Sequence, residues 1–128
     1  MRYELLNGNN LAYIGDAYYE LQIRNYLLSK NITKGSDLRK ISLRYVSAHA
    51  QASIYEGLKE ELTEEEINIF HRGRNSVKAV HRKNIDLGEY VIASGYEAII
   101  GYLYLKKDNK RLDYLINKSL EIVEESLN

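Results

Sequence analysis

The sequence has no cysteine, which excludes a disulfide framework and any chemistry that needs a thiolate. It has no apolar run long enough to cross a membrane, and its first residues lack the apolar core of a signal peptide. We therefore expect a cytoplasmic protein with no membrane partner. Because 128 residues can bury a core without disulfides or a structural metal, residues 1–128 are predicted to form one domain.

The chain also has no excess of charge of either sign. It contains 18 lysines and arginines and 18 aspartates and glutamates, which argues against a general binder of polyanions. A local basic surface remains compatible with this balance, because the distribution of charge decides such binding. Twelve tyrosines stand against one phenylalanine, and tyrosine suits half-buried positions and interfaces.

Proline is absent and alternating β-branched residues are scarce, whereas apolar residues recur at helical spacing along nearly the whole chain. The sequence therefore predicts an all-α bundle. The predicted helices span residues 10–29, 36–45, 47–55, 64–73, 85–105 and 112–123, and the clearest loop is 75–84.

Polar residues at the predicted helix starts can accept hydrogen bonds from free backbone N–H groups. One of these caps is followed three residues later by Glu66, which completes a capping box. Two glycines are expected to weaken helices, so that one helix frays near Gly73 and another is interrupted near Gly88. The candidate caps are Asn9 or Asn10, Ser36, Ser47 and Thr63.

Two acidic residues, Asp16 and Glu97, lie inside otherwise apolar helical runs. Helical spacing places Asp16 on a mostly apolar stripe, so we expect it to be withdrawn from solvent. A carboxylate in such surroundings is costly unless a cation or a hydrogen-bond network meets it. If Gly15 and Gly101 let the two helices approach closely, both carboxylates face one cavity. Their hard oxygens would suit Mg²⁺, with Mn²⁺ able to substitute.

A simpler interpretation of each carboxylate is that a buried tyrosine or lysine satisfies it, or that it is less buried than the pattern indicates. Glu20 illustrates the point, because it lies one turn beyond Asp16 but also one turn before Arg24. A surface ion pair between Glu20 and Arg24 explains it better than a role in a metal site.

A basic strip occupies residues 71–84, which contain five lysines or arginines and no acid. Basic side chains there could neutralise phosphates, and neighbouring polar ones could bind phosphate or sugar oxygens. The alternative is a solvated loop balanced by the acidic residues that precede it. The candidate RNA-binding residues are Arg72, Arg74, Asn75, Lys78, Arg82 and Lys83.

Four segments in order resemble the ribonuclease III catalytic domain family. Residues 11–17, Leu-Ala-Tyr-Ile-Gly-Asp-Ala, look like its signature helix, and residues 97–105 look like its second acidic helix. Residues 45–52 and 72–75 are similar to the compact bacterial branch, the Mini-ribonuclease III family, which lacks a double-stranded-RNA-binding domain. The resemblance covers nearly the whole chain, and we expect no room in it for that extra domain.

The resemblance implies a ribonuclease III-type endonuclease, an all-α homodimer that hydrolyses double-stranded RNA with Mg²⁺. It assigns Asp16 and Glu97 as catalytic residues and metal ligands. It also implies maturation of the precursor of large-subunit (23S) ribosomal RNA, with a large-subunit ribosomal protein as a partner. Two further family acids are replaced by Ala12 and Ser94. We therefore expect weak metal binding in the absence of RNA.

Two other functions remain compatible with the sequence. One is a non-catalytic RNA- or ribosome-binding helical module on the same fold, because a fold does not settle chemistry. Replacement of acids by Ala12 and Ser94 supports that alternative, whereas retention of Asp16 and Glu97 argues against it. The other is a dimeric helical scaffold, which is favoured only if the basic strip faces away from the acidic pair.

Overall fold

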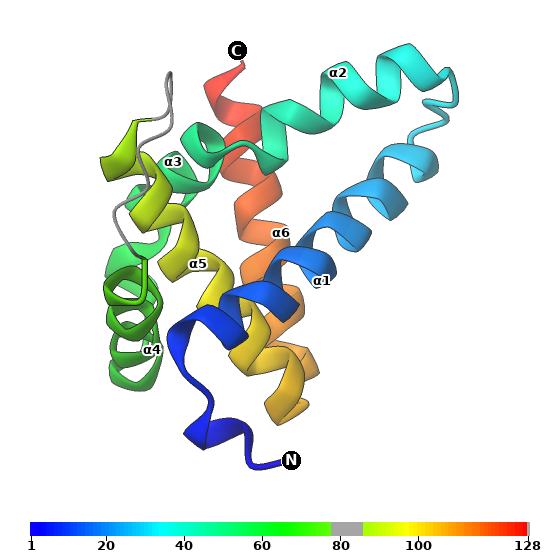
Figure 1. Cartoon of the computed structure of the whole chain (residues 1–128). Coiled ribbons are helices and arrows are strands. Elements are labelled where there is room, and N and C mark those ends of the chain that lie inside the picture. Colours follow the sequence, from blue (N-terminus) through cyan, green and yellow to red (C-terminus); the bar gives the residue numbers. More distant parts are fainter. Residues whose placement is uncertain (78–85, 128) are drawn as a thin grey trace.

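The structure, a computed structural model, describes residues 1–77 and 86–127. Within these ranges the chain forms helices and no strand, so the predicted all-α class is confirmed (Figure 1). The α-helices are α1 (Gly8–Ser29), α2 (Gly35–Val46), α3 (Ala48–Leu58), α4 (Glu64–Asn75), α5 (Leu87–Lys106) and α6 (Asn109–Ser126). Two 3-10 turns, η1 (Tyr3–Leu5) and η2 (Lys59–Glu61), accompany them.

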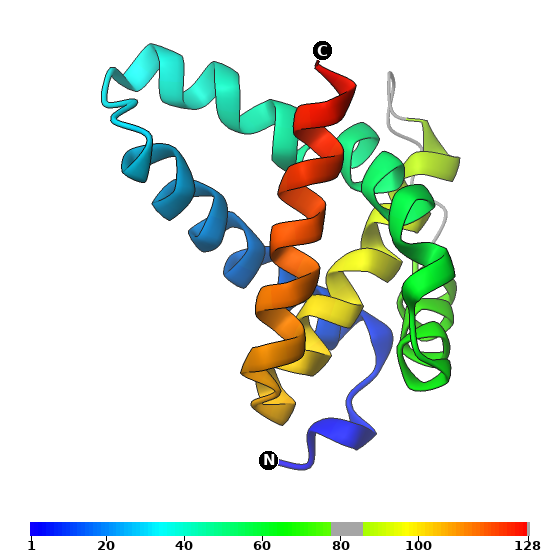
Figure 2. The ribbon, with the colours of Figure 1, turned by 180° about the vertical axis from the view of Figure 1, so that it is seen from behind.

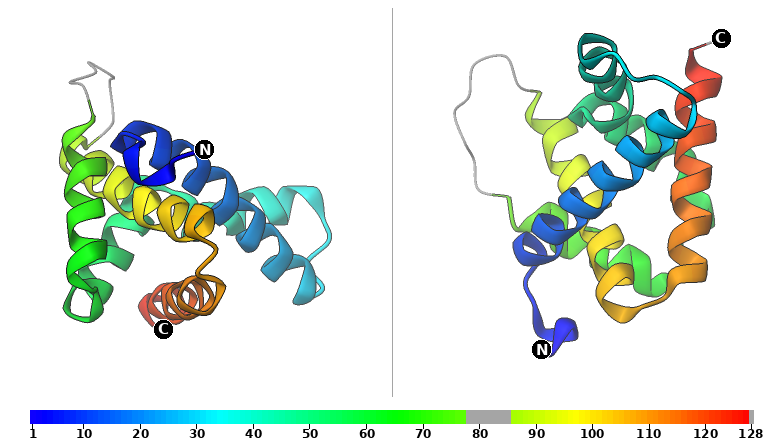
Figure 3. Two further views of the ribbon diagram at one scale, coloured as in Figure 1. Left: turned by 90° about the horizontal axis from the view of Figure 1, so that it is seen from below. Right: turned by 90° about the vertical axis from the view of Figure 1, so that its right-hand side faces the viewer.

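Helix α5 is the centre of the bundle. Its sequence is apolar around most of its circumference, and a helix of that kind is stable only when other helices cover it on several sides. It packs against α1, α4 and α3, and it lies between α1 and α6 in the left view of Figure 3. No helix in the described ranges combines the length and apolar character needed to span a membrane.

The remaining helices surround α5. Helices α1 and α2 pack against each other, and α2 leads back toward α3 (Figure 1). Helix α6 faces the viewer in Figure 2, where it crosses the bundle on the side opposite α1. Buried residues from all six helices contribute to one continuous apolar core. This arrangement leaves the crossing of α1 and α5 accessible from one side.

The predicted capping box is confirmed at the start of α4. The Thr63 backbone N–H donates to Glu66 Oε1 over 3.0 Å, and the Glu66 N–H donates to Thr63 Oγ1 over 3.1 Å. The predicted cap at Ser47 is confirmed as well, because its Oγ accepts from the Ala50 N–H over 3.1 Å. Capping signals in the sequence predict a helix start well where the packing of the adjacent segments places the helix start at the same residue.

Two predicted caps are wrong. Helix α1 begins earlier than Asn9, and Asn7 is its cap, accepting from the Asn10 N–H over 2.8 Å. Helix α2 already begins at Gly35, so Ser36 lies inside its first turn and caps nothing. Several polar residues near the start of each of these helices could serve as its N-cap. The path of the preceding chain decides which residue takes that position.

Of the two predicted helix disruptions, the interruption near Gly88 is wrong, and α4 ends two residues beyond Gly73, near which it was predicted to fray. Helix α4 continues to Asn75 because Gly73 packs against α5, where a Cβ would lie 2.6 Å from Ala98 Cβ and 2.8 Å from the Ser94 carbonyl oxygen. Gly88 lies in the first turn of an unbroken α5, which Asp86 caps. Most of the predicted loop over residues 75–84 lies outside the described residues.

Candidate active site

Helices α1 and α5 cross in backbone contact at two glycines. A Cβ on Gly15 would overlap the carbonyl oxygen of Glu97 and would lie 2.7 Å from the Gly101 nitrogen. A Cβ on Gly101 would overlap the carbonyl oxygen of Leu11 and lie 2.9 Å from the Gly15 nitrogen. The predicted close approach at Gly15 and Gly101 is therefore observed, and it sets Asp16 beside Glu97.

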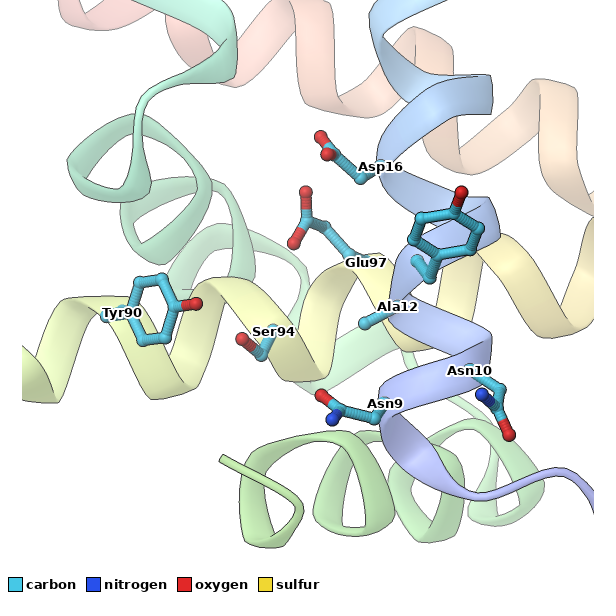
Figure 4. Close-up of a pocket in the computed structure, with 8 residues that line it drawn as sticks. Asn9, Asn10, Ala12, Asp16, Tyr90, Ser94 and Glu97 are labelled. Atoms are coloured by element: carbon cyan, nitrogen blue, oxygen red, sulfur yellow. The ribbon is translucent and has the colours of Figure 1, made fainter. Parts of the chain in front are cut away.

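An open pocket of about 490 Å³ lies at this crossing. The carboxylates of Asp16, from α1, and Glu97, from α5, point into the same space (Figure 4). The other lining residues are neutral: Asn9, Asn10, Ala12, Tyr13, Tyr90 and Ser94. All the charge of the pocket is thus negative and concentrated on two side chains from different helices.

The burial of the two carboxylates differs from expectation at Asp16, which is exposed rather than withdrawn from solvent. The buried stripe of α1 runs through Leu11, Gly15 and Tyr19, so Asp16 stands at its edge, about 100° around the helix from Gly15. Glu97 is half-buried between its own helix and the neighbouring ones. The pair therefore joins a sheltered carboxylate to one that solvent and ligands can reach.

Glu97 is unusually hard to ionise. Burial, followed by the adjacent carboxylate of Asp16, raises the pKa of Glu97 to about 9, and Glu20 adds a smaller effect in the same direction. A hydrogen bond from Gln51 opposes them by favouring the charged form. Two carboxylates that repel each other in this way form a site at which a divalent cation relieves the repulsion.

The donor set fits a hard cation that keeps water ligands. In residues 1–77 and 86–127 no group of three or more histidines, cysteines, aspartates or glutamates could enclose an ion. Asp16 and Glu97 could therefore supply only part of a coordination shell, and Mg²⁺ is commonly held by one or two carboxylates with waters and substrate phosphate. Ala12 and Ser94 line the same pocket beside the two carboxylates and carry no charge.

Sequence reasoning did not identify Asn9, Asn10, Tyr13 or Tyr90 as part of the pocket. For Asn9 and Tyr90, helical spacing relative to the two carboxylates could have indicated a place in the pocket. Asn9 precedes Asp16 by seven residues and Tyr90 precedes Glu97 by seven, which is two helical turns along the same faces. The spacing becomes informative only once the faces toward the α1–α5 crossing are known.

The basic residues are not gathered in this pocket. Arg72 donates from Nη1 to the carbonyl oxygens of Glu4 and Leu6, over 3.1 and 3.2 Å, and so holds the segment before α1. Arg74 and Asn75 are exposed in the last turn of α4. The other three predicted RNA contacts lie outside the described residues: Lys78, Arg82 and Lys83.

Comparisons with known proteins agree on one family. Residues 9–108 match the Ribonuclease III domain. The chain is 44% identical over 126 residues to a Mini-ribonuclease 3 of Enterococcus faecalis, covering 97% of this chain and 96% of the relative. It is 43% identical over 124 residues to a Mini-ribonuclease 3 of Staphylococcus aureus, covering 95% and 92%. A crystal structure of a Fusobacterium nucleatum protein, 34% identical, superposes with a TM-score of 0.82 over 91% of this chain and 93% of that one.

Proposed function

Because the chain belongs to the ribonuclease III family and is an endoribonuclease, we propose that it hydrolyses phosphodiester bonds in double-stranded RNA, with Asp16 and Glu97 as its catalytic residues. The observation that carries this proposal is the meeting of the two carboxylates in one open pocket at the α1–α5 crossing. Residues 1–128 serve as one catalytic domain.

Asp16 and Glu97 would hold Mg²⁺, and Mn²⁺ could take its place. The bound ion supplies an activated water and stabilises the charge that develops on the phosphodiester in the transition state. Asp16 is the exposed carboxylate and would face incoming substrate. Glu97, which extends from α5, is half-buried and would bind the ion from the protein side of the pocket. With only two protein carboxylates, the affinity for the ion should be weak until RNA adds phosphate oxygens.

The duplex itself would be recognised by shape, because A-form RNA presents backbone and 2′-hydroxyl groups more readily than base edges. Exposed Arg74 and Asn75 at the end of α4 are available for phosphate or sugar contacts. The chain has no net charge, so its affinity for RNA should be modest and should fall steeply with salt. The proposed backbone contacts are Arg72, Arg74, Asn75, Lys78, Arg82 and Lys83.

A homodimer would place two such centres on one duplex, each cutting one strand. An apolar stripe on the outer face of α1 supports this assembly. Tyr13 is 82% exposed, Leu21 54% and Leu28 52%. Successive members of this set are separated by about two helical turns. Apolar side chains repeated along one exposed face are typical of a surface that pairs with another protein surface.

The proposed substrate is the precursor of large-subunit (23S) ribosomal RNA in the cytoplasm. The modest RNA affinity expected for a neutral chain favours a partner that presents the substrate, and a large-subunit ribosomal protein would do so while bound to that RNA. This partner would add specificity that a pocket with two carboxylates and a neutral wall does not itself supply.

Cleavage assays on a structured fragment of this precursor test the proposal. The wild type is compared with Asp16→Asn and Glu97→Gln, with Mg²⁺ and with chelator. Discrete cuts should appear only for the wild type with metal, and each variant should lose at least about 10²-fold in rate. Asp37→Asn, the same chemical change at an exposed position in α2, is the matched control and should cut normally.

Equal cleavage by the wild type and Asp16→Asn would remove Asp16 from the mechanism. RNA binding by the wild type without any metal-dependent cut would instead support the non-catalytic binding module. Analytical ultracentrifugation of the same samples tests the dimer, and Leu21→Glu in the exposed stripe of α1 should shift the protein toward monomer.

A further inference from the structure

The pocket at the α1–α5 crossing has an acidic end and a neutral end. Asp16 and Glu97 form the acidic end. The neutral end is formed by Asn9, Ser94 and Tyr90 and lies away from Asp16 (Figure 4). Asn9 and Tyr90 each precede the carboxylate of their own helix by seven residues, which is about 10 Å along the helix axis. Binding of an ion by the two carboxylates therefore leaves the neutral end without a role.

The three side chains of the neutral end share one space. Tyr90 and Ser94 are one helical turn apart on the same face of α5, and Asn9 extends toward them from α1 (Figure 4). Asn9 and Tyr90 are exposed, so a ligand can reach both. Ser94 is only 9% exposed and has no hydrogen-bond partner among the described residues, yet none of their fully buried side-chain oxygens lacks one. The Ser94 hydroxyl is therefore open to the pocket.

The chemistry of the neutral end matches a neutral hydroxyl better than a phosphate. Its two hydroxyls and one amide can each donate and accept hydrogen bonds. A phosphate oxygen only accepts, and the described residues that line the pocket include two carboxylates but no lysine or arginine, so a phosphate without a cation is repelled there. The ribose 2′-hydroxyl is neutral, donates and accepts, and is presented by A-form RNA more readily than base edges are.

We propose that the neutral end is a ribose subsite: Asn9, Ser94 and Tyr90 bind the 2′-hydroxyl of a nucleotide that neighbours the scissile phosphate. The inference rests on the proposed role of Asp16 and Glu97, which places that phosphate at the acidic end. Because the neutral end lies about 10 Å farther along both helices, the contact falls on an adjacent nucleotide of the strand. The 2′-hydroxyl distinguishes RNA from DNA, so this subsite selects RNA as the substrate.

The test compares binding of two duplexes of one sequence, RNA and its 2′-fluoro counterpart, which keeps the A-form but has no hydroxyl to donate. Fluorescence anisotropy is measured with Mg²⁺ in the Asp16→Asn background, where the duplex should stay intact. The background protein should prefer RNA, and adding Tyr90→Phe with Ser94→Ala should reduce that preference about fivefold. Tyr104→Phe removes an exposed hydroxyl of the same helix outside the pocket and is the control.

A preference for RNA that stays within about twofold of the background value would overturn the inference. Equal weakening of both duplexes would also overturn it, because it would indicate a phosphate at the neutral end. Asn9→Ala with Tyr90→Phe changes two exposed side chains and replaces the first double variant should that protein not fold. Binding is scored without cleavage, so an unchanged preference counts against the ribose subsite. Absence of metal-dependent cuts by the wild type counts against the catalytic proposal instead.

Discussion

The crossing of α1 and α5 gives the sharpest prediction, the effect of Gly15→Ala. The added Cβ would overlap the Glu97 carbonyl oxygen and lie 2.7 Å from the Gly101 nitrogen, whereas ordinary contacts are 3.4–4 Å. These are backbone atoms of a packed helix, and the Glu97 carbonyl oxygen would lie 1.8 Å from the added Cβ, so relief requires the helices to separate by about 1.5 Å. Overpacking of this kind costs about 3 kcal/mol, the upper part of its usual range, and alanine returns about 1 kcal/mol through helix propensity.

Gly15→Ala should therefore lower the free energy of unfolding by about 2 kcal/mol, measured by chemical denaturation. It should also move Asp16 relative to Glu97, and a displacement of about 1 Å at a catalytic pair reduces cleavage about 10²-fold. Gly35→Ala is the matched control, since its Cβ would lie 3.6 Å from its nearest contact, the end of a flexible side chain. A Gly15→Ala protein as stable and active as the control would refute the close-approach argument.

Three further predictions concern groups away from the crossing. Burial alone would raise the pKa of Glu66, but hydrogen bonds from Arg111 and Thr63 outweigh it and leave the pKa below the ordinary 4.5. The ionised Glu66 carboxylate therefore stabilises the fold fully above pH 4.5, and this stabilisation is lost as the pH falls through its lowered pKa. Glu66→Gln removes the titrating group, so the free energy of unfolding should fall less steeply with acid in denaturation curves. Tyr19→Phe removes the 2.8 Å hydrogen bond to the Tyr45 carbonyl oxygen and should cost about 1–3 kcal/mol in urea denaturation. Arg72→Ala should speed amide hydrogen exchange in residues 3–6, and unchanged exchange there would contradict its anchoring role.

Much of the local structure could be predicted from the sequence, because it depends on neighbours in the chain. The capping box at Thr63 follows from residue types three positions apart. The ion pair of Glu20 with Arg24, 3.0 Å apart, follows from their separation by one helical turn. The all-α class follows from apolar spacing and the absence of proline.

The effect of a glycine on its helix depends on the atoms packed opposite it, which its position in the sequence does not reveal. Gly15 and Gly101 were correctly predicted to allow close approach, since each stands beside a carboxylate in an apolar run. Gly73 was predicted only to loosen the helix end, yet it is buried against α5, and α4 continues past it to Asn75. A lone glycine costs a helix about 1 kcal/mol, and packing against a neighbouring helix exceeds that cost.

The sequence by itself determined the helices and singled out Asp16 and Glu97, which the structure places in one pocket. Only the tertiary structure decided that Asp16 is exposed and that Glu97 is half-buried with a raised pKa. Helical periodicity fixes the angle between side chains on one helix, but it does not fix which face a neighbour covers. That choice depends on the packing of α1, α3 and α5 together, and it sets the chemistry of the pocket.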